Sequence, residues 1–258
     1  MTHPWFAGPP RPRVLAHRGL VTPDGAAAGI AENSFAAVAE AHAAGAHYVE
    51  SDCHLTRDGV VVLFHDPDLS RVTGDTRRVD EVSLRTLADL MSGHGGVITL
   101  EQALDAFPDV HWNLDVKAAA AAEEVGRIVA PHAARVLVTS FSDDRRRAAL
   151  AAAAAAGADL TPATSAGTSL VSRLVGAVSL RSRRVARRVL RNVDAVQVPE
   201  RQGRLRIVTP RLIDYAHAAG VEVHVWTVND PDDMTRLVTM GVDGIVTDRA
   251  DVALRTLS

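Results

Sequence analysis

A helix stop followed directly by an apolar run recurs four times in this chain and limits the folds open to it. The four copies read A-G-A-H-Y-V-E (44–50), A-G-A-D-L (156–160), A-G-V-E-V (219–223) and M-G-V-D-G-I-V (240–246). Glycine is favoured at a helix end because it adopts a left-handed backbone without a steric penalty. Strands that alternate with helices build a parallel sheet. We therefore predict a TIM (β/α)₈ barrel of the α/β class, with an open doubly wound sheet as the alternative.

Short β-rich runs alternate with alanine-rich stretches along the whole chain, and many of these runs are apolar on both faces. That composition is typical of a parallel sheet covered by helices. No G-x-G-x-x-G sequence follows the first run, which disfavours the doubly wound alternative. The predicted strands are 14–17, 48–52, 60–64, 111–116, 136–140, 158–162, 195–198, 221–227 and 244–247. The predicted helices include 34–44, 100–107, 119–130, 143–156, 210–219 and 231–240.

Length and composition allow a single barrel and little else. A chain of 258 residues has the usual size of one TIM barrel, so we predict a single domain over 1–258. Aromatic residues make up only 4%, so the core must be mostly Ala, Val and Leu. The net charge of −3 gives no reason to expect a nucleic-acid partner. Cys53 is the one cysteine, which excludes an intrachain disulfide, and we expect it in the core.

Nothing in the sequence directs the chain to a membrane or out of the cell. Residues 1–12 lack the apolar core of a secretory signal, and no apolar run approaches the roughly 20 residues of a membrane span. We therefore predict a cytoplasmic protein. Seven arginines lie between 173 and 191, which could mark an amphipathic helix on anionic lipid. We favour the solvated outer face of a barrel helix, so membrane contact is not expected. The sequence does not indicate an oligomeric state.

Polar residues gather where the predicted strands end. Glu50 and Asp52 share one face of a strand, because alternate side chains point the same way. Two inward carboxylates repel each other unless a positive charge lies between them, which favours a divalent cation. The other strand ends carry His17, Arg18, His65, Asn113, Asp115 and Lys117. In a TIM barrel these ends form one rim, the catalytic one.

Each of these motifs has an ordinary structural explanation when taken alone. His17 could form a hydrogen bond in the core, and an E-x-D pair is common on strands that face solvent. Asp66 before Pro67 could cap a turn. Together, however, two histidines, three carboxylates and two cations at the ends of successive strands would be costly to bury without a metal or ligand. Their joint position therefore predicts a site.

An ordered set of motifs identifies a family that this chain resembles. From about Val14 to the C-terminus the chain contains H-R-G, A-E-N-S, V-E-S-D, F-H-D-P-D-L-S-R-V-T-G, I-T-L-E-Q-A-L, W-N-L-D-V-K, V-H-V-W-T-V-N and G-V-D-G-I-V-T-D. This pattern resembles the glycerophosphodiester phosphodiesterase family. The resemblance implies a TIM barrel with a short insertion after the second strand, here about 54–98. It also implies an enzyme that hydrolyses small-molecule glycerophosphodiesters to sn-glycerol 3-phosphate and an alcohol, with the help of a metal.

The same resemblance assigns roles to individual residues. It implies Glu50, Asp52 and Asp115 as ligands of one divalent cation, and His17 and His65 as a catalytic pair. The remaining positions that it implies are phosphate contacts at Arg18 and Lys117, an acidic-amide pair beside the site at Glu32 and Asn33, and an aromatic pocket wall at Trp226. Oxygen ligands favour Mg²⁺ or Ca²⁺, with Mn²⁺ as a further option.

Two positions depart from the family pattern. Asp115 stands where Glu is usual, as in the related sphingomyelinase D-like enzymes, and Ala31 stands where Pro is usual. The arginine-rich segment 173–191 supports an alternative function, a lipid-directed phosphodiesterase of lysophospholipase D or sphingomyelinase D type. A further alternative is a barrel that binds phosphate without turnover. Near the C-terminus, His224 shares a strand face with Trp226 and is a candidate for the pocket. Thr247 and Asp248 are expected to close the last strand and cap the final helix.

Overall fold

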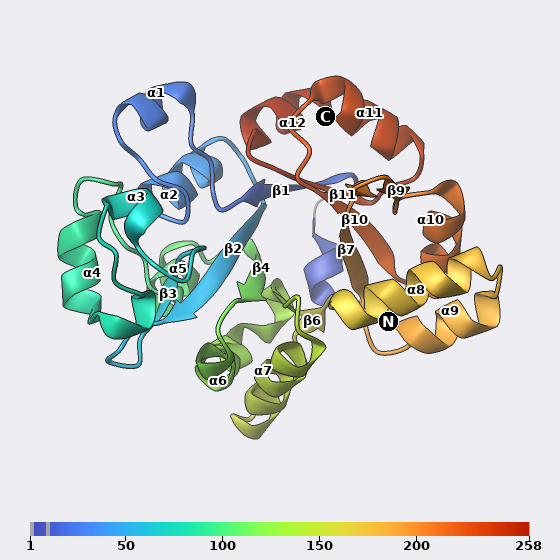
Figure 1. Cartoon of the computed structure of the whole chain (residues 1–258), viewed down its shortest axis with the longest axis horizontal. Helices are drawn as coiled ribbons and strands as arrows, with labels where there is room; N and C mark the ends of the chain where they lie inside the picture. The colour runs from blue at the N-terminus through green and yellow to red at the C-terminus, as the bar shows by residue number, and fades with distance from the viewer. Residues whose placement is uncertain (1–2, 9–10, 258) are drawn as a thin grey trace.

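Eight parallel strands surround a central core, with helices on the outside (Figure 1). The computed structural model describes residues 3–8 and 11–257; Met1, Thr2, Pro9, Pro10 and Ser258, which the predicted single domain includes, lie outside the described residues. Around the barrel the strands are β6 (Ala163–Thr164), β5 (Val136–Thr139), β4 (His111–Val116), β2 (Tyr48–Leu55), β1 (Arg13–His17), β11 (Gly244–Thr247), β10 (Glu222–Trp226) and β7 (Ala195–Pro199). The predicted TIM barrel is confirmed.

The barrel closes between β6 and β7 through a single bridge and not through a full ladder. Ser165 pairs with Ala195, and the amide of Ala166 donates to the Ala195 carbonyl at 3.0 Å. The strand predicted at 158–162 is wrong, because most of this stretch is exposed and the strand begins only after Pro162. Proline has no N–H to donate to a ladder, so pairing starts beyond it. The A-G-A-D-L copy of the repeat thus ends a helix without starting a strand.

The six predicted helices are present. They are α2 (Phe35–Ala43), α5 (Leu100–Ala106), α6 (Ala122–Val129), α7 (Asp143–Ala155), α10 (Pro210–His217) and α11 (Pro231–Thr239). A Ser, Thr or Asp side chain caps five of them at the N-terminus, as the four free N–H groups of a helix start require. Gly45, Gly157, Gly220 and Gly241 have positive φ angles directly after their helices, which confirms the predicted stops.

The arginine-rich segment forms two outer helices. These are α8 (Thr168–Ser179) and α9 (Arg183–Leu190), which lie side by side outside the barrel in Figure 1. Ala186, Val189 and Leu190 of α9 are buried, whereas its four arginines are exposed. The favoured prediction of an outer barrel helix is therefore confirmed. No helix in the part of the chain that the structure describes is long and apolar enough to span a membrane.

Further elements lie outside the barrel wall. The stretch 54–98 contains β3 (Val61–Leu63), antiparallel to β2, with α3 (Ser70–Thr73), a 3₁₀ turn (Val79–Glu81) and α4 (Leu84–Met91). This stretch has its own apolar cluster, which includes Val62, Phe64 and Leu87, and it forms the lobe at the left of Figure 1. The remaining elements are α1 (Pro23–Ala27), α12 (Ala250–Thr256), two 3₁₀ turns (Ala119–Ala121, Ala130–Arg135) and a hairpin of β8 (Arg201–Gln202) with β9 (Leu205–Arg206).

The N-terminal end of the barrel is closed by aromatic side chains and a buried ion pair. Trp5, in a 3₁₀ turn (Pro4–Ala7), is fully buried and packs edge-to-face on Tyr48. Arg13 donates to both carboxylate oxygens of Glu222, at 2.8 and 2.9 Å. A buried arginine needs such a partner, because an unpaired charge is expensive away from water. Cys53 lies in the main core, as predicted, and burial raises the pKa of its thiol.

Candidate active site

A cavity of about 750 Å³ opens at the C-terminal ends of the strands. Active sites of TIM barrels lie at this end, because the loops after the strands meet there. The structure brings most of the predicted residues together in the wall of this cavity, namely His17, Arg18, Glu50, Asp52, His65, Asp115, Lys117 and Trp226. Glu32 and Asn33 do not line the cavity but contact residues that do.

Three buried carboxylates and one lysine form the floor of the cavity. Asp52 on β2 lies opposite Asp115 on β4 in the parallel register. The Lys117 ammonium bridges them, with Nζ 2.9 Å from Asp52 Oδ1 and 2.7 Å from Asp115 Oδ2. Glu50 Oε2 and Asp115 Oδ1 are buried and have no hydrogen-bond partner among the described residues. The floor therefore holds two carboxylate oxygens that still require a positive or donating group.

The pKa values of these three carboxylates shift in different directions. Burial and the nearby charges of Asp52 and Asp115 raise the pKa of Glu50 well above its usual range. Burial also raises the pKa of Asp115, although Lys117 opposes this effect. For Asp52 the penalty of burial is outweighed by Lys117 and Arg18, which lower its pKa. Three carboxylates thus face two cations, and Glu50 is the carboxyl group that holds its proton most readily.

Arg18 connects the carboxylate floor to the outer rim. Its φ of +59° turns the chain sharply after β1, and its Nε lies 3.1 Å from Asp52 Oδ2. Its Nη1 donates to Glu32 Oε1 at 2.7 Å. Asn33 is buried and donates through Nδ2 to Asp52 Oδ2 at 2.9 Å, while its Oδ1 accepts from Ser51. Glu32 and Asn33 therefore orient Arg18 and Asp52.

Each of the two predicted catalytic histidines is paired with its own carboxylate. His17 Nδ1 lies 2.6 Å from Asp248 Oδ1, and Asn229 donates to the other oxygen of Asp248 at 2.8 Å. His65 Nδ1 lies 2.7 Å from Asp66 Oδ1. A hydrogen bond at Nδ1 fixes the ring orientation and leaves Nε2 available for proton transfer.

One prediction about residues near β10 and β11 is wrong, and one candidate residue there does not reach the cavity. Asp248 does not cap α12, since the N-cap is Arg249 and forms no side-chain cap hydrogen bond. The side chain of Asp248 is instead drawn to His17, which lies beside it because β1 pairs with β11. His224 does not line the cavity: it is fully buried beneath it and bonds to Gln197 and Glu222. Thr247 ends β11, as predicted.

Apolar side chains form the other half of the cavity. Trp226, at the end of β10, meets Phe141 edge-to-face with ring centroids 5.9 Å apart. Val171 and Val175 of α8 and Leu205 of β9 extend this apolar wall outward. The cavity therefore has a charged inner end suited to a phosphate and an apolar outer end suited to a less polar group.

A divalent cation fits the chemistry of the carboxylate floor. Hard cations such as Mg²⁺ and Ca²⁺ take oxygen ligands, and the floor offers only carboxylate oxygens. The unpartnered Glu50 Oε2 and Asp115 Oδ1 are the atoms such an ion would satisfy. Across the described residues, no three His, Cys, Asp or Glu side chains already converge on a metal position. Lys117 lies between two of the three carboxylates.

The comparisons agree with this geometry. The model of the glycerophosphoryl diester phosphodiesterase family matches residues 17–252. The chain belongs to this family. It is 41% identical over 241 residues to the "Probable glycerophosphodiester phosphodiesterase 2" of Mycobacterium tuberculosis, a match that covers 92% of this chain and 88% of that relative. The predicted family and the predicted enzyme class are thereby confirmed.

Solved structures agree on the fold. The glycerophosphodiester phosphodiesterase of Thermotoga maritima superposes with a TM-score of 0.70 at 24% identity, over 94% of this chain and 96% of that one. A phosphodiesterase of Oleispira antarctica, solved in complex with its product sn-glycerol-3-phosphate, gives a TM-score of 0.71 at 21% identity, over 95% and 96%. At these identities the likeness supports the barrel and not the individual side chains.

Several residues of the site were not assigned a role in it from the sequence. Asp66 follows His65 directly, so the H-D pair itself was the available signal. Asp66 Oδ2 also accepts from Arg71 Nε at 2.5 Å, and Arg71 Nη2 donates to Glu32 at 2.7 Å. The effect of burial is outweighed by hydrogen bonds from Arg71 and His65, which lower the pKa of Asp66. Arg71 lies in the insertion, so this lobe contributes directly to the histidine rim.

Proposed function

We propose that this chain hydrolyses glycerophosphodiesters to sn-glycerol 3-phosphate and an alcohol, with His17 and His65 as the general acid–base pair. The observation that carries this proposal is that both histidines line the charged end of one cavity, each oriented by its own carboxylate. Hydrolysis requires one proton to leave the attacking hydroxyl and one to reach the leaving alcohol. Two imidazoles that are held at Nδ1 and use Nε2 for proton transfer can divide this work near neutral pH, although His17 Nε2 also lies 3.8 Å from Glu50 Oε2.

Arg18 and Lys117 are the groups that we propose to contact the phosphoryl oxygens. Both are held over Asp52, by contacts of 3.1 and 2.9 Å, so they need little reorganisation when substrate arrives. Fixed cations stabilise the charge that develops on a phosphoryl group in the transition state. The Lys117 pKa is raised, since Asp52 and Asp115 outweigh the effect of burial, so this side chain stays charged throughout the neutral range.

Glu50, Asp52 and Asp115 are the residues that would hold one divalent cation, Mg²⁺ or Ca²⁺, with Mn²⁺ as a further option. Such an ion, when bound, neutralises the phosphate and lowers the pKa of a coordinated oxygen nucleophile. The two unpartnered carboxylate oxygens support this assignment. Asp115 is one methylene shorter than the glutamate usual in the family, so its carboxylate would reach less far toward such an ion.

A turnover screen over glycerophosphodiesters tests the reaction and its metal. We expect release of sn-glycerol 3-phosphate that stops with EDTA and returns with Mg²⁺, Ca²⁺ or Mn²⁺. H17A and H65A should each lower kcat by about 10²-fold or more, in line with the usual contribution of a general acid or base. His42, which pairs with Asp109 away from the cavity, provides the matched H42A control. Near-normal kcat in both H17A and H65A would contradict the assignment.

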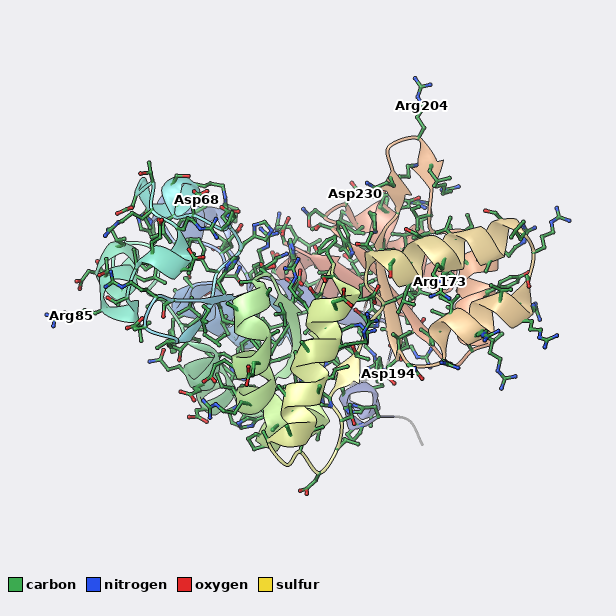
Figure 2. The ribbon with its side chains drawn as sticks, turned by 60° about the horizontal axis from the view of Figure 1, so that its bottom comes forward. Asp68, Arg85, Arg173, Asp194, Arg204 and Asp230 are labelled. Atoms are coloured by element: carbon green, nitrogen blue, oxygen red, sulfur yellow. The ribbon has the colours of Figure 1, made fainter. Side chains whose placement is uncertain are left out.

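A lipid-directed phosphodiesterase is the second candidate, and the apolar outer half of the cavity favours it. Leu205 of the β8–β9 hairpin lies in that wall, and the neighbouring Arg204 projects from the tip of the hairpin into solvent (Figure 2). An apolar wall beneath a basic hairpin tip suits a substrate that carries one acyl chain and lies among anionic lipids. Comparing kcat/KM for glycerophosphocholine and lysophosphatidylcholine separates the two candidates. Release of product from either substrate excludes a barrel that only binds phosphate.

A further inference from the structure

A second cavity, of about 480 Å³, lies on the outside of the barrel between α7, α8 and the end of α9. Five arginines line it: Arg146 and Arg147 from α7, Arg173 from α8, Arg188 from α9 and Arg191 just after α9. We call this cavity the arginine groove. Figure 2 shows α8 and α9 side by side on this face, with Arg173 labelled on α8.

The guanidinium groups of the arginine groove are incompletely balanced by protein carboxylates. Asp144 pairs with Arg147, and Asp143 Oδ1 lies 3.4 Å from Arg146 Nη2. Within the part of the chain that the structure describes, Arg173, Arg188 and Arg191 have no ion pair. Three exposed cations therefore line one cavity without an ion pair of their own among the described residues, an arrangement that favours an anion there.

Arg146 is the one buried arginine among the five that line the groove. Its side chain is only 5% exposed, and its Nε has no hydrogen-bond partner among the described residues. Its other nitrogens donate to Thr164 Oγ1 at 3.2 Å and to Asp143, which leaves Nε as the free donor. Arg146 therefore places a buried positive charge, only partly satisfied by protein acceptors, against the groove.

Other charged groups near the arginine groove do not neutralise its positive charge. Asp143 is already committed, since it accepts hydrogen bonds from Ser169 and from two backbone amides at the start of α8. Asp194 acts on Arg146 through its charge, but its Oδ2 accepts from the Thr164 amide at 2.9 Å. The arginines still outnumber these carboxylates.

We propose that the arginine groove binds a compact anion carrying two or more phosphate groups, at a site separate from the catalytic cavity. Planar guanidinium groups bind phosphate oxygens in pairs, which suits several arginines around one small volume. The two cavities lie on opposite sides of α8, because Leu170 and Arg173 line the groove whereas Val171 and Val175 line the catalytic cavity. The proposal therefore does not depend on the proposed hydrolysis.

The anion can be a free polyphosphate or the head groups of an anionic lipid surface, and two probes distinguish these sources. The first is inorganic tripolyphosphate, titrated in a calorimeter at about 0.1 M salt, where surface charges beyond roughly 10 Å are screened. The second is vesicles of phosphatidylglycerol and phosphatidylcholine in equal parts, measured by co-sedimentation against pure phosphatidylcholine. A saturable Kd with tripolyphosphate assigns a soluble anion, and binding to anionic vesicles alone assigns a lipid head group.

A pair of matched triple variants separates a built site from general attraction. The groove variant is R173Q/R188Q/R191Q, and the control is R181Q/R184Q/R187Q. Both remove three exposed arginines from one segment, but the control residues do not line the groove. Arg146 is left unchanged because it also holds Thr164 and Asp143. We expect the groove variant to weaken binding of the successful probe by about tenfold or more, and the control by less than about twofold.

Three results would overturn the proposal: no binding of either probe to the wild-type chain, equal weakening in both variants, or an unchanged Kd in the groove variant. Circular dichroism and thermal melting check that both variants are folded. If the groove variant melts below the control, the single changes R173Q and R191Q carry the comparison against R184Q. Turnover of a glycerophosphodiester should be the same in both triple variants, because neither changes a residue of the catalytic cavity.

Discussion

The contact between Asp248 and His17 offers a direct test of how this proposed catalytic histidine is held. Asp248 Oδ1 lies 2.6 Å from His17 Nδ1, and Asn229 anchors the other carboxylate oxygen at 2.8 Å. Asp248→Asn keeps the shape of the side chain and removes its charge. The amide can then present its NH₂ to Nδ1, which favours the wrong tautomer, and it no longer stabilises a protonated ring.

The size of the effect follows from the exposure of this contact. A general acid or base contributes about 10² to 10⁴ in rate, and loss of its orienting carboxylate forfeits much of that. The Asp248 side chain is 52% exposed, so solvent weakens its interaction with the imidazolium. We therefore expect kcat to fall at the lower end of the range, about 10²-fold, which corresponds to about 2.7 kcal/mol. KM should change little, because Asp248 does not line the cavity.

Steady-state turnover of glycerophosphocholine, with sn-glycerol 3-phosphate detected by a coupled dehydrogenase, provides both constants. Asp251→Asn is the control, since Asp251 also pairs with arginines near the C-terminus but has no contact with a histidine. A kcat for Asp248→Asn within about threefold of the wild type would refute the orienting role. A large rise in KM at unchanged kcat would instead assign Asp248 to substrate binding.

Three further changes test the barrel and the cavity. The effect of burial is outweighed by hydrogen bonds from His224 and Arg13, which lower the pKa of Glu222 to about 2. The ionised carboxylate therefore stabilises the fold at pH values above its ordinary pKa of 4.5. Glu222→Gln should cost about 3 kcal/mol at pH 7, and urea unfolding should show this difference shrinking as the pH falls from 4.5 towards 2. Gly126→Ala places a Cβ 2.2 Å from a backbone oxygen of α7 and should lower the free energy of unfolding by about 2–3 kcal/mol, measured in urea. Trp226→Ala should raise KM about tenfold with a smaller change in kcat, measured by initial rates.

The barrel could be predicted from local signals because most of its elements carry them. Glycine stops and apolar runs are properties of a few neighbouring residues, and they located the six helices and most strands. These local signals did not locate the sixth strand, because β6 has only two residues, Ala163 and Thr164. Its position depends on pairing with β5 and on the bridge from Ser165 to Ala195, which are contacts between distant segments.

The residues of the site also fall into those that local sequence signals reveal and those that only distant contacts bring together. Strand ends are local, so the residues expected at the rim were found from the sequence and do line one cavity. The partner of His17 could not be found, because Asp248 lies 231 positions further along the chain. Only closure of the barrel, which pairs β1 with β11, brings these two residues together. The arginine groove has the same origin, since its cations come from three helices whose relative placement the sequence does not reveal.

The two cavities differ in charge balance, and this difference predicts opposite responses to a chelator. At the carboxylate floor, three acidic groups outnumber the two cations Lys117 and Arg18. An anionic substrate therefore needs the proposed divalent cation to supply the missing positive charge. In the arginine groove the cations are in excess, and an anion needs no metal there. EDTA should therefore abolish turnover and leave the Kd of tripolyphosphate, measured by calorimetry in the same buffer, unchanged. If EDTA removes both, the anion binds at the carboxylate floor and the groove is not its site.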